Sequence, residues 1–478
     1  MSDKLFQIFN ENLVNYEVNL GTAGVRLTDI DTLKKVAVRI CIYCLNYSNV
    51  SGLMITASHN PSKFNGLKLV INEGDLMSAE EEIQLNRFIN GEWINFNHSV
   101  SKIYLGRDTR ESGDDIAKYL KIIFNNTPIT IIDLGIVHTP YLYWFVEKCN
   151  KGEFIDYYGD IKDNFYKLKW DDNFKHPFII DCANGSIGKV KNLLKDIFDE
   201  KGLNYMFINT GDNHINDECG SDFAWNNKNI KIWNKEGNTD LCGLIKGFTF
   251  DGDGDRILFF EGGIIGDNVD INRIYSGDHF ICFYSLLLSN FSESGLVFTP
   301  YSNFGLLNYI SKRDISYSIC APGVKNLIST SHNYRISCIF EYNGHGNIEW
   351  NKNLEYEKEM MPYLNLLYSK AGDVIGHCLI ILNDFLGGSD FNYFEILPQY
   401  HGCIKVNNME LFKSIKTNYI ETEIIYPESL ATDLKNICEG NDNRVVVRPS
   451  GTEPIFRIMI EGENGEELFK EIKEKIEF

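Results

Sequence analysis

The chain has 478 residues, of which 44% are hydrophobic and 23% are charged, a composition that excludes an intrinsically disordered protein. At roughly 150 residues per domain, this length predicts about three domains with sizeable cores. The 46 Lys and Arg against 66 Asp and Glu give a formal net charge of −20, whereas nucleic-acid-binding surfaces are basic. We therefore expect no nucleic-acid partner, and an anionic substrate would need a local basic cluster.

The cysteines and apolar stretches indicate a soluble protein of a reducing compartment. Among 12 scattered cysteines only Cys41 and Cys44 lie close together, within an apolar helical stretch. Without a second pair, we interpret them as packed core residues rather than as a redox or zinc motif. The start, MSDKLFQIFNENLV, lacks the features of a signal peptide, and the apolar run at 280–288 is shorter than the ~20 residues that span a bilayer. We expect a cytoplasmic protein with no membrane partner.

The first 150 residues predict an α/β region. DTLKKVAVRICIYCL at 31–45 has the 3.6-residue period of an amphipathic helix, and GLMIT at 52–56 is typical of a buried strand. KIYLGR at 102–107 and ITIIDLG at 129–135 predict two more strands. Such alternation favours α/β layers with parallel or mixed sheets.

The loop ITASHNP at 55–61 ends the strand GLMIT with Ser58, a histidine and an asparagine. A hydrolase nucleophile would sit between glycines in a G-x-S-x-G pattern, which is absent here. Ser58 could instead carry a phosphoryl group, which would bring roughly −1.5 to −2 charges and three acceptor oxygens. Such a group needs a metal or cations beside it, for which Arg26, Lys68 and Arg256 are candidates. Taken alone, an ordinary serine turn explains this loop as well.

A second α/β region follows, with a strand in HPFIID at 176–181 and a helix over GKVKNLLKDIFDEKG at 188–202. Its loop FTFDGDGDRILFF contains the acids Asp251, Asp253 and Asp255 alternating with glycines. Three carboxylates held together repel by about 4 kcal/mol per pair at ~4 Å and an effective dielectric of roughly 20, and a hard divalent cation reverses that sign. The EF-hand alternative fails on spacing. We therefore predict a Mg²⁺ or Ca²⁺ site at these three residues.

The third region repeats the strand–loop pattern and ends in IFEYNGHG at 339–346. Glu341, followed by Asn343, Gly344 and His345, suits two neighbouring sugar hydroxyls, because a carboxylate accepts two hydrogen bonds at once. A capped turn would explain this short motif equally well.

The end of the chain predicts a small α+β region: two strands in RVVVRPSGTEPIFRIMIEG, then a helix over EELFKEIKEKIEF with apolar residues at helical spacing. The loop between the strands is a candidate anion site. Its donors would be a guanidinium, hydroxyls and backbone N–H groups, supplied by Arg448, Ser450, Gly451, Thr452 and, on the next strand, Arg457. An ordinary hairpin turn with an exposed arginine remains the alternative.

Together and in this order, the four loops resemble those of the α-D-phosphohexomutases, and more closely those of the phosphoacetylglucosamine mutases. The resemblance runs from about residue 20 to the C-terminus and rests on LGTAGVR, ITASHNP, NGLKLV, GRDTRESG, DLGIVHTP, IDCANG, DGDGDR, APGVKNL, FEYNGHG and RPSGTEP. Asn343 is the most telling residue, because hexose mutases of the superfamily usually have serine there. The chain departs from the family pattern at Gly254, Pro322, Asn326 and Tyr342, of which the last three concern the sugar pocket.

The resemblance implies an α/β fold of four domains around a central cleft. Three would be related α/β domains with mixed sheets, and the last a smaller C-terminal α+β domain. We expect a phosphoserine-loop domain at 1–150, a metal-loop domain at 151–267, a sugar-loop domain at 268–386 and a phosphate-binding domain at 387–478.

The resemblance also implies an intramolecular phosphotransferase of the isomerase class. It would interconvert N-acetylglucosamine 6-phosphate and N-acetylglucosamine 1-phosphate through a phosphorylated Ser58, with one Mg²⁺ held by Ser58 and the three aspartates. N-acetylglucosamine 1,6-bisphosphate would be the intermediate and activator, and the product would feed UDP-N-acetylglucosamine synthesis. We expect a monomer or a weak homodimer.

Residue roles follow from the same resemblance and from charge. His59 or Lys68 would relay the proton of the attacking hydroxyl. Phosphate or the phosphoserine would be gripped by Arg26, Arg107, Arg256 and Lys325. Glu341, Asn343, Gly344 and His345 would bind the sugar, and the loop at 448–452 with Arg457 its phosphate.

Two other functions compete with this hypothesis. A phosphoglucomutase or phosphomannomutase on the same fold would share every catalytic part and differ only around the sugar loop. A non-catalytic sugar-phosphate-binding protein is disfavoured, because Ser58 and all three aspartates are present.

Overall fold

The computed structural model describes residues 2–21, 24–47, 50–72, 77–170, 176–211, 213–237, 241, 243–289, 293–369, 371–406, 409–438, 443–450 and 455–476. It divides into two compact units. Unit 1 comprises Met1–Ser276, Asn343–Asn347 and Leu354–Ser389, and unit 2 comprises Gly277–Tyr342, Ile348–Asn353 and Asp390–Phe478.

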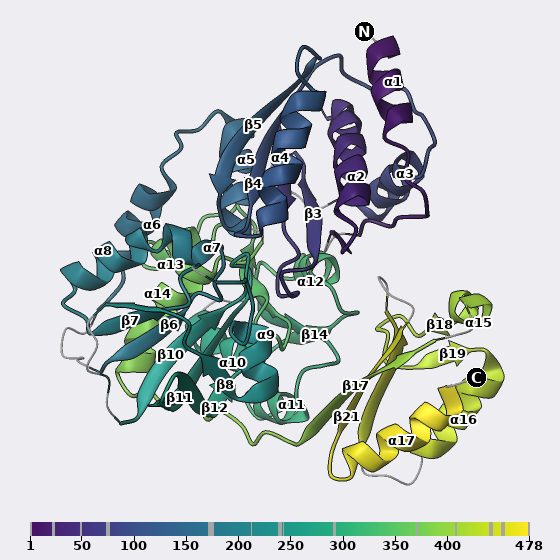
Figure 1. Cartoon of the computed structure of the whole chain (residues 1–478). Coiled ribbons are helices and arrows are strands. Elements are labelled where there is room, and N and C mark those ends of the chain that lie inside the picture. Colours follow the sequence, from purple (N-terminus) through teal and green to yellow (C-terminus); the bar gives the residue numbers. More distant parts are fainter. Residues whose placement is uncertain are drawn as a thin grey trace. The chain divides into compact units, whose positions relative to one another are not determined.

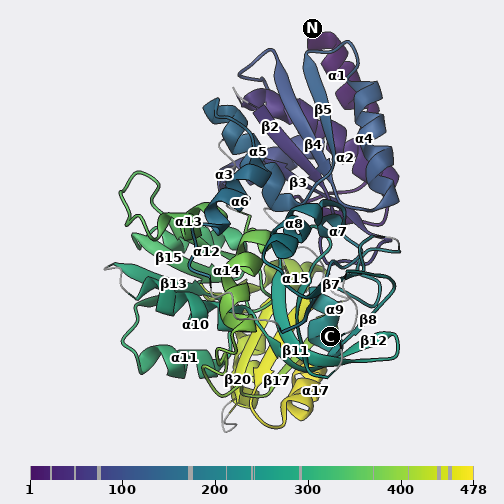
Figure 2. The ribbon, with the colours of Figure 1, turned by 90° about the vertical axis from the view of Figure 1, so that its left-hand side faces the viewer.

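The first sheet of unit 1 has the strand order β1-β3-β2-β4-β5, with β1 and β3 antiparallel to their neighbours and β2, β4 and β5 parallel (Figures 1 and 2). Its elements are α1 (Ser2–Glu11), β1 (Val25–Leu27), α2 (Ile30–Tyr43), η1 (Cys44–Asn46), β2 (Val50–Ile55), β3 (Asn65–Val70), α3 (Ala79–Ile89), β4 (Ser101–Arg107), α4 (Glu111–Ile123), β5 (Ile129–Ile136) and α5 (Thr139–Lys151).

Successive residues of β2 pack on opposite faces of this sheet, as a strand of period two requires. Leu53 and Ile55 join a large core with α1, α2, α3 and α4, whereas Met54 joins a smaller core with α5. Figure 2 shows α4 and α5 on opposite sides of the sheet. Cys41 and Cys44 are buried free thiols of the larger core, as predicted.

The second sheet of unit 1 has the order β8-β12-β11-β10-β6-β7-β9. Its region contains α6 (Tyr157–Phe165), β6 (Phe178–Asp181), α7 (Ser186–Val190), α8 (Asn192–Glu200), β7 (Tyr205–Ile208), α9 (Ser221–Asn227), β8 (Asn229–Lys231), β9 (Lys235–Gly237), β10 (Ile245–Phe250), β11 (Ile257–Ile265), β12 (Asn268–Tyr275), α13 (Met361–Leu366) and α14 (Val374–Leu386). The helix predicted over 188–202 is two helices that meet at Lys191.

Unit 2 contains a sheet of order β14-β13-β15-β16, except for the first two residues of β16, which belong to unit 1, and a second sheet of order β17-β21-β20. Its elements are α10 (Gly277–Leu288), β13 (Ser294–Phe298), α11 (Phe304–Ser311), β14 (Tyr317–Ile319), α12 (Val324–Ser331), β15 (Ile336–Phe340), β16 (Gly346–Trp350), β17 (Gln399–Lys405), α15 (Met409–Ser414), β18 (Lys416–Thr417), β19 (Ile424–Tyr426), α16 (Glu428–Cys438), β20 (Arg444–Pro449), β21 (Ile455–Glu461) and α17 (Gly465–Ile476).

The helix at the C-terminus is an example of sequence pattern fixing both an element and its buried face. Leu468, Ile472 and Ile476 recur every four residues of α17 and are all buried in one core with residues of β20 and β21. Figure 1 shows α17 beside β21. The α/β class with mixed sheets is confirmed. The boundaries of the four predicted domains stay a prediction. In the described part of the chain, no helix combines the length and the apolar character needed to cross a membrane.

A buried arginine joins three helices of unit 1. Arg39 of α2 has no exposed surface, and its guanidinium donates to the carbonyl oxygens of Phe9, Asn12, Phe88 and Ile89 at 2.7–3.1 Å. These carbonyls belong to the C-terminal ends of α1 and α3 or follow them, where helices leave acceptors unsatisfied and favour a cation. Burial lowers the pKa of Arg39 to about 10, so the side chain stays charged at neutral pH.

We expect Arg39→Met to lower the free energy of unfolding by about 3–5 kcal/mol, because four buried carbonyls lose their donors together. Lys118→Met is the matched control, since Lys118 is an exposed cation on α4. Chemical denaturation of both variants checks the expectation. Equal midpoints for the two would show that Arg39 contributes little.

Candidate active site

Ser58 lies in the loop between β2 and β3 and has a backbone conformation unusual for serine. Its φ is 52°, in the left-handed region that costs a non-glycine residue about 1 kcal/mol or more. The Ser58 N–H donates to Thr56 Oγ1 at 2.9 Å, and its hydroxyl donates to Asp251 Oδ2 at 2.7 Å. The side chain is almost fully buried. The loop therefore directs one strained hydroxyl at the predicted metal loop.

Two side chains outside the predicted set hold this conformation in place. Asn216 Nδ2 donates to the carbonyl oxygen of Ser58 at 2.7 Å and to that of Asn60 at 3.0 Å. Arg110 donates to the same two carbonyls and is itself paired with the buried Asp108. Arg110 lay within the motif GRDTRESG without an assigned role, and no pattern in the sequence singled out Asn216.

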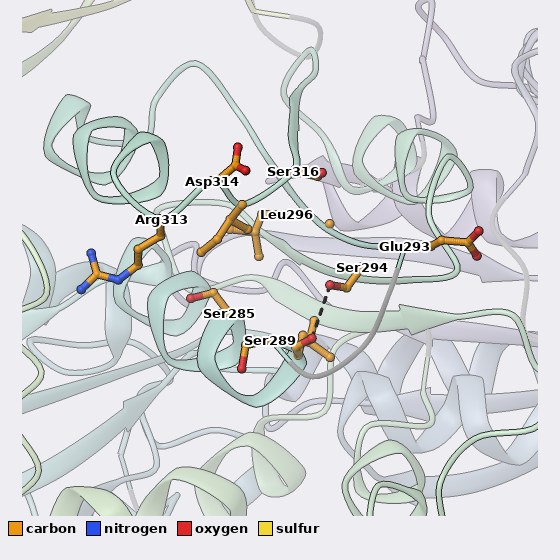
Figure 3. A pocket seen from close by; sticks show the side chains of 11 residues that line it. Ser285, Ser289, Glu293, Ser294, Leu296, Arg313, Asp314 and Ser316 are labelled. Atoms are coloured by element: carbon orange, nitrogen blue, oxygen red, sulfur yellow. Dashed lines mark hydrogen bonds between the residues drawn. The ribbon is translucent and has the colours of Figure 1, made fainter.

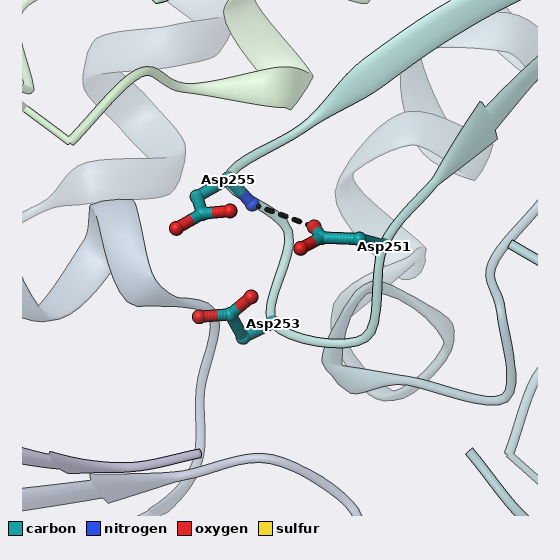
Figure 4. A group of neighbouring side chains, drawn as sticks. All are labelled: Asp251, Asp253 and Asp255. Atoms are coloured by element: carbon teal, nitrogen blue, oxygen red, sulfur yellow. Dashed lines mark hydrogen bonds between the residues drawn. The ribbon is translucent and has the colours of Figure 1, made fainter. Parts of the chain in front are cut away.

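The three aspartates lie on the hairpin loop between the antiparallel strands β10 and β11, where Phe250 pairs with Ile257. One carboxylate oxygen of each lies within 4.8 Å of the others, and all three residues are buried. Figure 4 shows their side chains directed into one space, with the Asp255 N–H donating to Asp251. The predicted convergence is therefore present in the structure.

The electrostatics of this cluster are those of crowded acids. Burial, with Asp255 and Asp253 beside it, raises the pKa of Asp251 well above its usual range. Burial acts to raise the pKa of Asp253 and of Asp255 as well, but Lys68 lowers both. Asp251 is thus the carboxylate of the cluster that burial and its neighbours make hardest to ionise.

Lys68 is the main cation of the cluster within the described residues. Its buried Nζ lies 2.7 Å from both Asp253 Oδ2 and Asp255 Oδ2. Burial alone would lower the pKa of Lys68, but the two carboxylates raise it above its usual value. Lys68 therefore holds its proton and neutralises charge, and it is a poor proton acceptor.

The other groups predicted to act near Ser58 are three arginines and His59, and their contacts differ. Arg26 donates to Asn60 Oδ1 at 3.1 Å, and Arg256 Nε lies 3.9 Å from Asp255 Oδ1. Burial and the nearby Arg256 and Arg26 lower the pKa of His59 well below its usual value, so its ring is neutral. Arg107 instead pairs with Asp114 and Asp133.

The sugar loop is shared between the two units. Gly344 and His345, in unit 1, pack on the metal loop: Ile257 N donates to Gly344 O at 3.2 Å, and His345 Nδ1 lies 2.7 Å from Asp255 O. The Asn343 side chain accepts from the N–H of His345. Glu341, in unit 2, accepts from Gly323 N at 3.0 Å, next to Lys325 at the start of α12.

The predicted phosphate loop belongs to unit 2. Arg448 of β20 lies directly opposite Arg457 of β21, and both side chains therefore project from the same face of the sheet. Like charges opposed in this way are unfavourable, and the carboxylate of Glu421, 3.0 Å from Arg448 Nη1, offsets part of that cost. Ser450 is buried at the end of β20. Gly451 and Thr452 lie outside the described residues.

The donor set fits a hard divalent cation. Asp253 Oδ1 and Asp255 Oδ1 are buried and have no hydrogen-bond partner within the described part of the chain. Buried carboxylate oxygens are costly when unsatisfied, and oxygen ligands alone favour Mg²⁺ or Ca²⁺. Ser58 Oγ adjoins the cluster, so a phosphoryl oxygen on it would reach the same space.

Thr139 is another contributor that the sequence did not reveal. Its N–H donates to the carbonyl oxygen of Asp253 at 2.8 Å, and its hydroxyl donates to Asp253 Oδ2 at 2.5 Å. Thr139 begins α5 and fixes both ends of a predicted metal ligand. Its motif, DLGIVHTP, carried the family resemblance without a role for the threonine.

A separate cavity of about 300 Å³ lies in unit 2 near the end of α10 (Figure 3). Its lining includes Ser285, Ser294, Arg313 and Asp314. None of the predicted site residues lines it, and we assign it no role.

Comparison with known proteins agrees with these loops. Three domain families match the chain: "Phosphoglucomutase/phosphomannomutase, alpha/beta/alpha domain I" at residues 20–93 and 89–156, "Phosphoacetylglucosamine mutase AMG1, domain III" at 253–382, and "Phosphoglucomutase/phosphomannomutase, C-terminal domain" at 438–477. The chain is 28% identical to an Encephalitozoon cuniculi protein named "Probable phosphoacetylglucosamine mutase", over 92% of this chain and 89% of that one. It is 27% identical to the phosphoacetylglucosamine mutase of Sus scrofa, over 93% and 91%.

A solved structure shares the fold. The Aspergillus fumigatus N-acetylphosphoglucosamine mutase, in complex with GlcNAc-6P and magnesium, superposes with a TM-score of 0.82 at 23% identity, over 99% of this chain and 98% of that one. The fold and the ordered loops define a phosphohexomutase. More narrowly, the chain belongs to the phosphoacetylglucosamine mutase family of that superfamily.

We expect Asn216→Gly to lower mutase turnover by about tenfold or more, because the Ser58 carbonyl loses its closest donor and the hydroxyl loses its orientation. Glycine tolerates the positive φ of 57° at this position, so the backbone is not strained by the change.

Asn126→Gly is the matched control, because Asn126 also has a positive φ, 58°, and is exposed. Steady-state kinetics and thermal unfolding of both variants check the expectation. Equal turnover in the two variants would contradict a role for Asn216 in holding Ser58.

Proposed function

We propose that this chain interconverts N-acetylglucosamine 6-phosphate and N-acetylglucosamine 1-phosphate through a phosphorylated Ser58 and a bound 1,6-bisphosphate. The observation that carries the proposal is the 2.7 Å hydrogen bond from Ser58 Oγ to Asp251, at the edge of the buried carboxylate cluster. Family membership supplies the substrate class, and the named relatives are mutases of the N-acetylated sugar.

Each half-reaction moves one phosphoryl group. The oxygen of the sugar 1-hydroxyl bonds to phosphorus while the bond from phosphorus to Ser58 Oγ breaks, and the proton of the hydroxyl ends on Ser58 Oγ. In the second half, Ser58 Oγ gives up this proton and bonds to the phosphorus of the 6-phosphate, the bond from phosphorus to the sugar O6 breaks, and O6 takes up the proton. The sugar 1-phosphate leaves, and the enzyme is phosphorylated again.

His59 is the better of the two predicted proton acceptors. Its ring is neutral, and its Nδ1 is buried without a hydrogen-bond partner among the described residues. Lys68 is held in its charged form by two carboxylates. We therefore assign proton transfer to His59 and charge neutralisation at the phosphoserine to Lys68, Arg26 and Arg256.

The proposed reaction requires one divalent metal ion. Asp251, Asp253, Asp255 and an oxygen on Ser58 would hold one Mg²⁺, which when bound would neutralise charge on the transferring phosphoryl group. Lys68 and Thr139 orient the carboxylates for this purpose, because both bond Asp253 directly.

The remaining groups bind the substrate. Glu341 and Asn343 would accept from the sugar hydroxyls, with Gly344, His345 and Lys325 shaping that site. Arg448, Ser450, Gly451, Thr452 and Arg457 would bind the phosphate that is not being transferred. Arg448 and Arg457 support this assignment, because they project from one face of the sheet and can offer two guanidinium groups to one anion.

The proposal extends to organisation and location. We place the domain boundaries at 150/151, 267/268 and 386/387, and propose a cytoplasmic enzyme that acts as a monomer or weak homodimer. Ten cysteines of the described residues are free thiols, which suits a reducing compartment.

Ser58→Ala is expected to abolish turnover, because the acceptor oxygen is gone, whereas Ser62→Ala in the same loop keeps it. The assay supplies N-acetylglucosamine 6-phosphate, Mg²⁺ and a trace of the 1,6-bisphosphate. Intact-mass measurement should show one phosphoryl group on wild type and on Ser62→Ala, and none on Ser58→Ala. A kcat/KM higher for glucose phosphate than for the N-acetyl sugar would overturn the substrate assignment.

Removal of divalent metal should stop turnover, and added Mg²⁺ should restore it. Asp253→Ala should reduce kcat by about 10³-fold or more, since the transferring phosphoryl group loses most of its neutralisation. Asp267→Ala, an exposed acid close by in the chain, should leave kcat unchanged. Full activity in a chelator would refute the metal assignment.

A further inference from the structure

Three aromatic rings of unit 2 lie in mutual contact with nearly parallel planes, a triangular cluster called the stack below. Tyr342 lies parallel to His401, with centroids 5.3 Å apart and planes at 13°, and next to Tyr301, at 5.9 Å and 29°. Tyr301 and His401 complete the group at 6.2 Å and 21°. Offset-stacked rings at these separations attract beyond their area of burial.

The stack joins segments that are distant in the chain. Tyr301 follows β13, and Tyr342 follows Glu341 in the sugar loop. His401 belongs to β17, in the small sheet that also carries Arg448. Tyr301 and Tyr342 pack on Val446 and Met459, which pair across β20 and β21. Packed aromatic and aliphatic side chains therefore link the sugar-loop segment to the sheet that carries the phosphate loop.

Tyr301 also contacts the predicted phosphate-binding arginine. Its hydroxyl accepts from Arg448 Nε at 3.2 Å, and the guanidinium lies 5.7 Å from its ring centroid. Arg448 Nη1 donates to Glu421 Oε2 at 3.0 Å. Arg448 and Val446 are two residues apart on β20 and so project from the same face of the strand, beside the stack.

The Tyr301 ring is itself fixed by the side chains around it. It is 7% exposed, in contact with Tyr342 on one side and with Val446 and Met459 below. A tyrosine ring in such packing has little rotational freedom, so its hydroxyl presents a fixed acceptor to Arg448. The orientation of the Arg448 guanidinium therefore depends on the Tyr301 ring, which packs against Tyr342 of the sugar loop.

We propose that Tyr342 and Tyr301 are positioning residues for Arg448. Tyr342 orders the Tyr301 ring, the Tyr301 hydroxyl fixes the plane of the Arg448 guanidinium, and Arg448 presents its remaining donors to the substrate phosphate. The proposal rests on the function proposed above and deepens it. It also assigns a role to Tyr342, a departure from the family pattern.

Four variants separate this role from a merely structural one. Tyr342→Ala should raise KM for N-acetylglucosamine 6-phosphate about tenfold and change kcat less than about threefold, because ground-state grip is lost rather than chemistry. Tyr342→Phe keeps the ring and should behave as wild type. Tyr301→Phe removes only the acceptor hydroxyl and should raise KM by a similar factor. Tyr419→Ala, at a tyrosine 88% exposed in the same unit, should change neither constant.

The decisive measurement repeats Tyr342→Ala in an Arg448→Ala background. If Tyr342 acts through Arg448, its removal there should cause less than about a twofold further rise in KM. A further tenfold rise, or wild-type KM for Tyr342→Ala alone, would overturn the proposal.

Calorimetric binding of the same sugar phosphate in Mg²⁺ separates this proposal from the mutase assignment. Should wild type bind without turning over, the mutase function fails, and the Kd values of the four variants then decide on Tyr342 by the same pattern. Wild type that binds no sugar phosphate would overturn both.

Discussion

Three buried carboxylates on one short hairpin loop are the constraint on which the rest of unit 1 depends. Carboxylates at this spacing repel strongly at low dielectric, and the folded protein tolerates them because other groups donate hydrogen bonds to their oxygens. Lys68 bonds two of them, backbone N–H groups of the loop bond the third, and Thr139 bonds Asp253. The remaining carboxylate oxygens point into one space, and chemistry on Ser58 follows from that arrangement.

The strained backbone of Ser58 directs its hydroxyl at this carboxylate cluster. A serine in the left-handed region is held there by bonds to its carbonyl from Asn216 and Arg110, on separate segments. These bonds, with the one from the Ser58 N–H to Thr56, fix the direction of the hydroxyl toward Asp251. Residues in sparsely populated conformations persist where surrounding structure compensates the cost, and a group that must donate and accept a phosphoryl repeatedly benefits from such a fixed direction.

Much of this was predictable from the sequence, for physical reasons. Alternating aspartate and glycine between buried strands can only bring acids together, and the four-residue period of α17 dictated its buried face. The sequence could not indicate Asn216 or Thr139, because each acts across more than a hundred residues on an atom that no local pattern marks. The helix predicted over 188–202 is divided into α7 and α8 at Lys191, although the φ of −58° and ψ of −18° at that residue are still helical, so the pattern of apolar residues did not mark the division.

Arg39 has a consequence for the N-terminal segment. Two of its four acceptors, the carbonyls of Phe9 and Asn12, belong to α1 and the residue after it. Removal of these residues would leave the buried Arg39 guanidinium charged and without two of its four acceptors. Residues 2–12 therefore help to hold α2 in place. We expect proteolytic cleavage within them to destabilise the sheet whose β2–β3 loop carries Ser58.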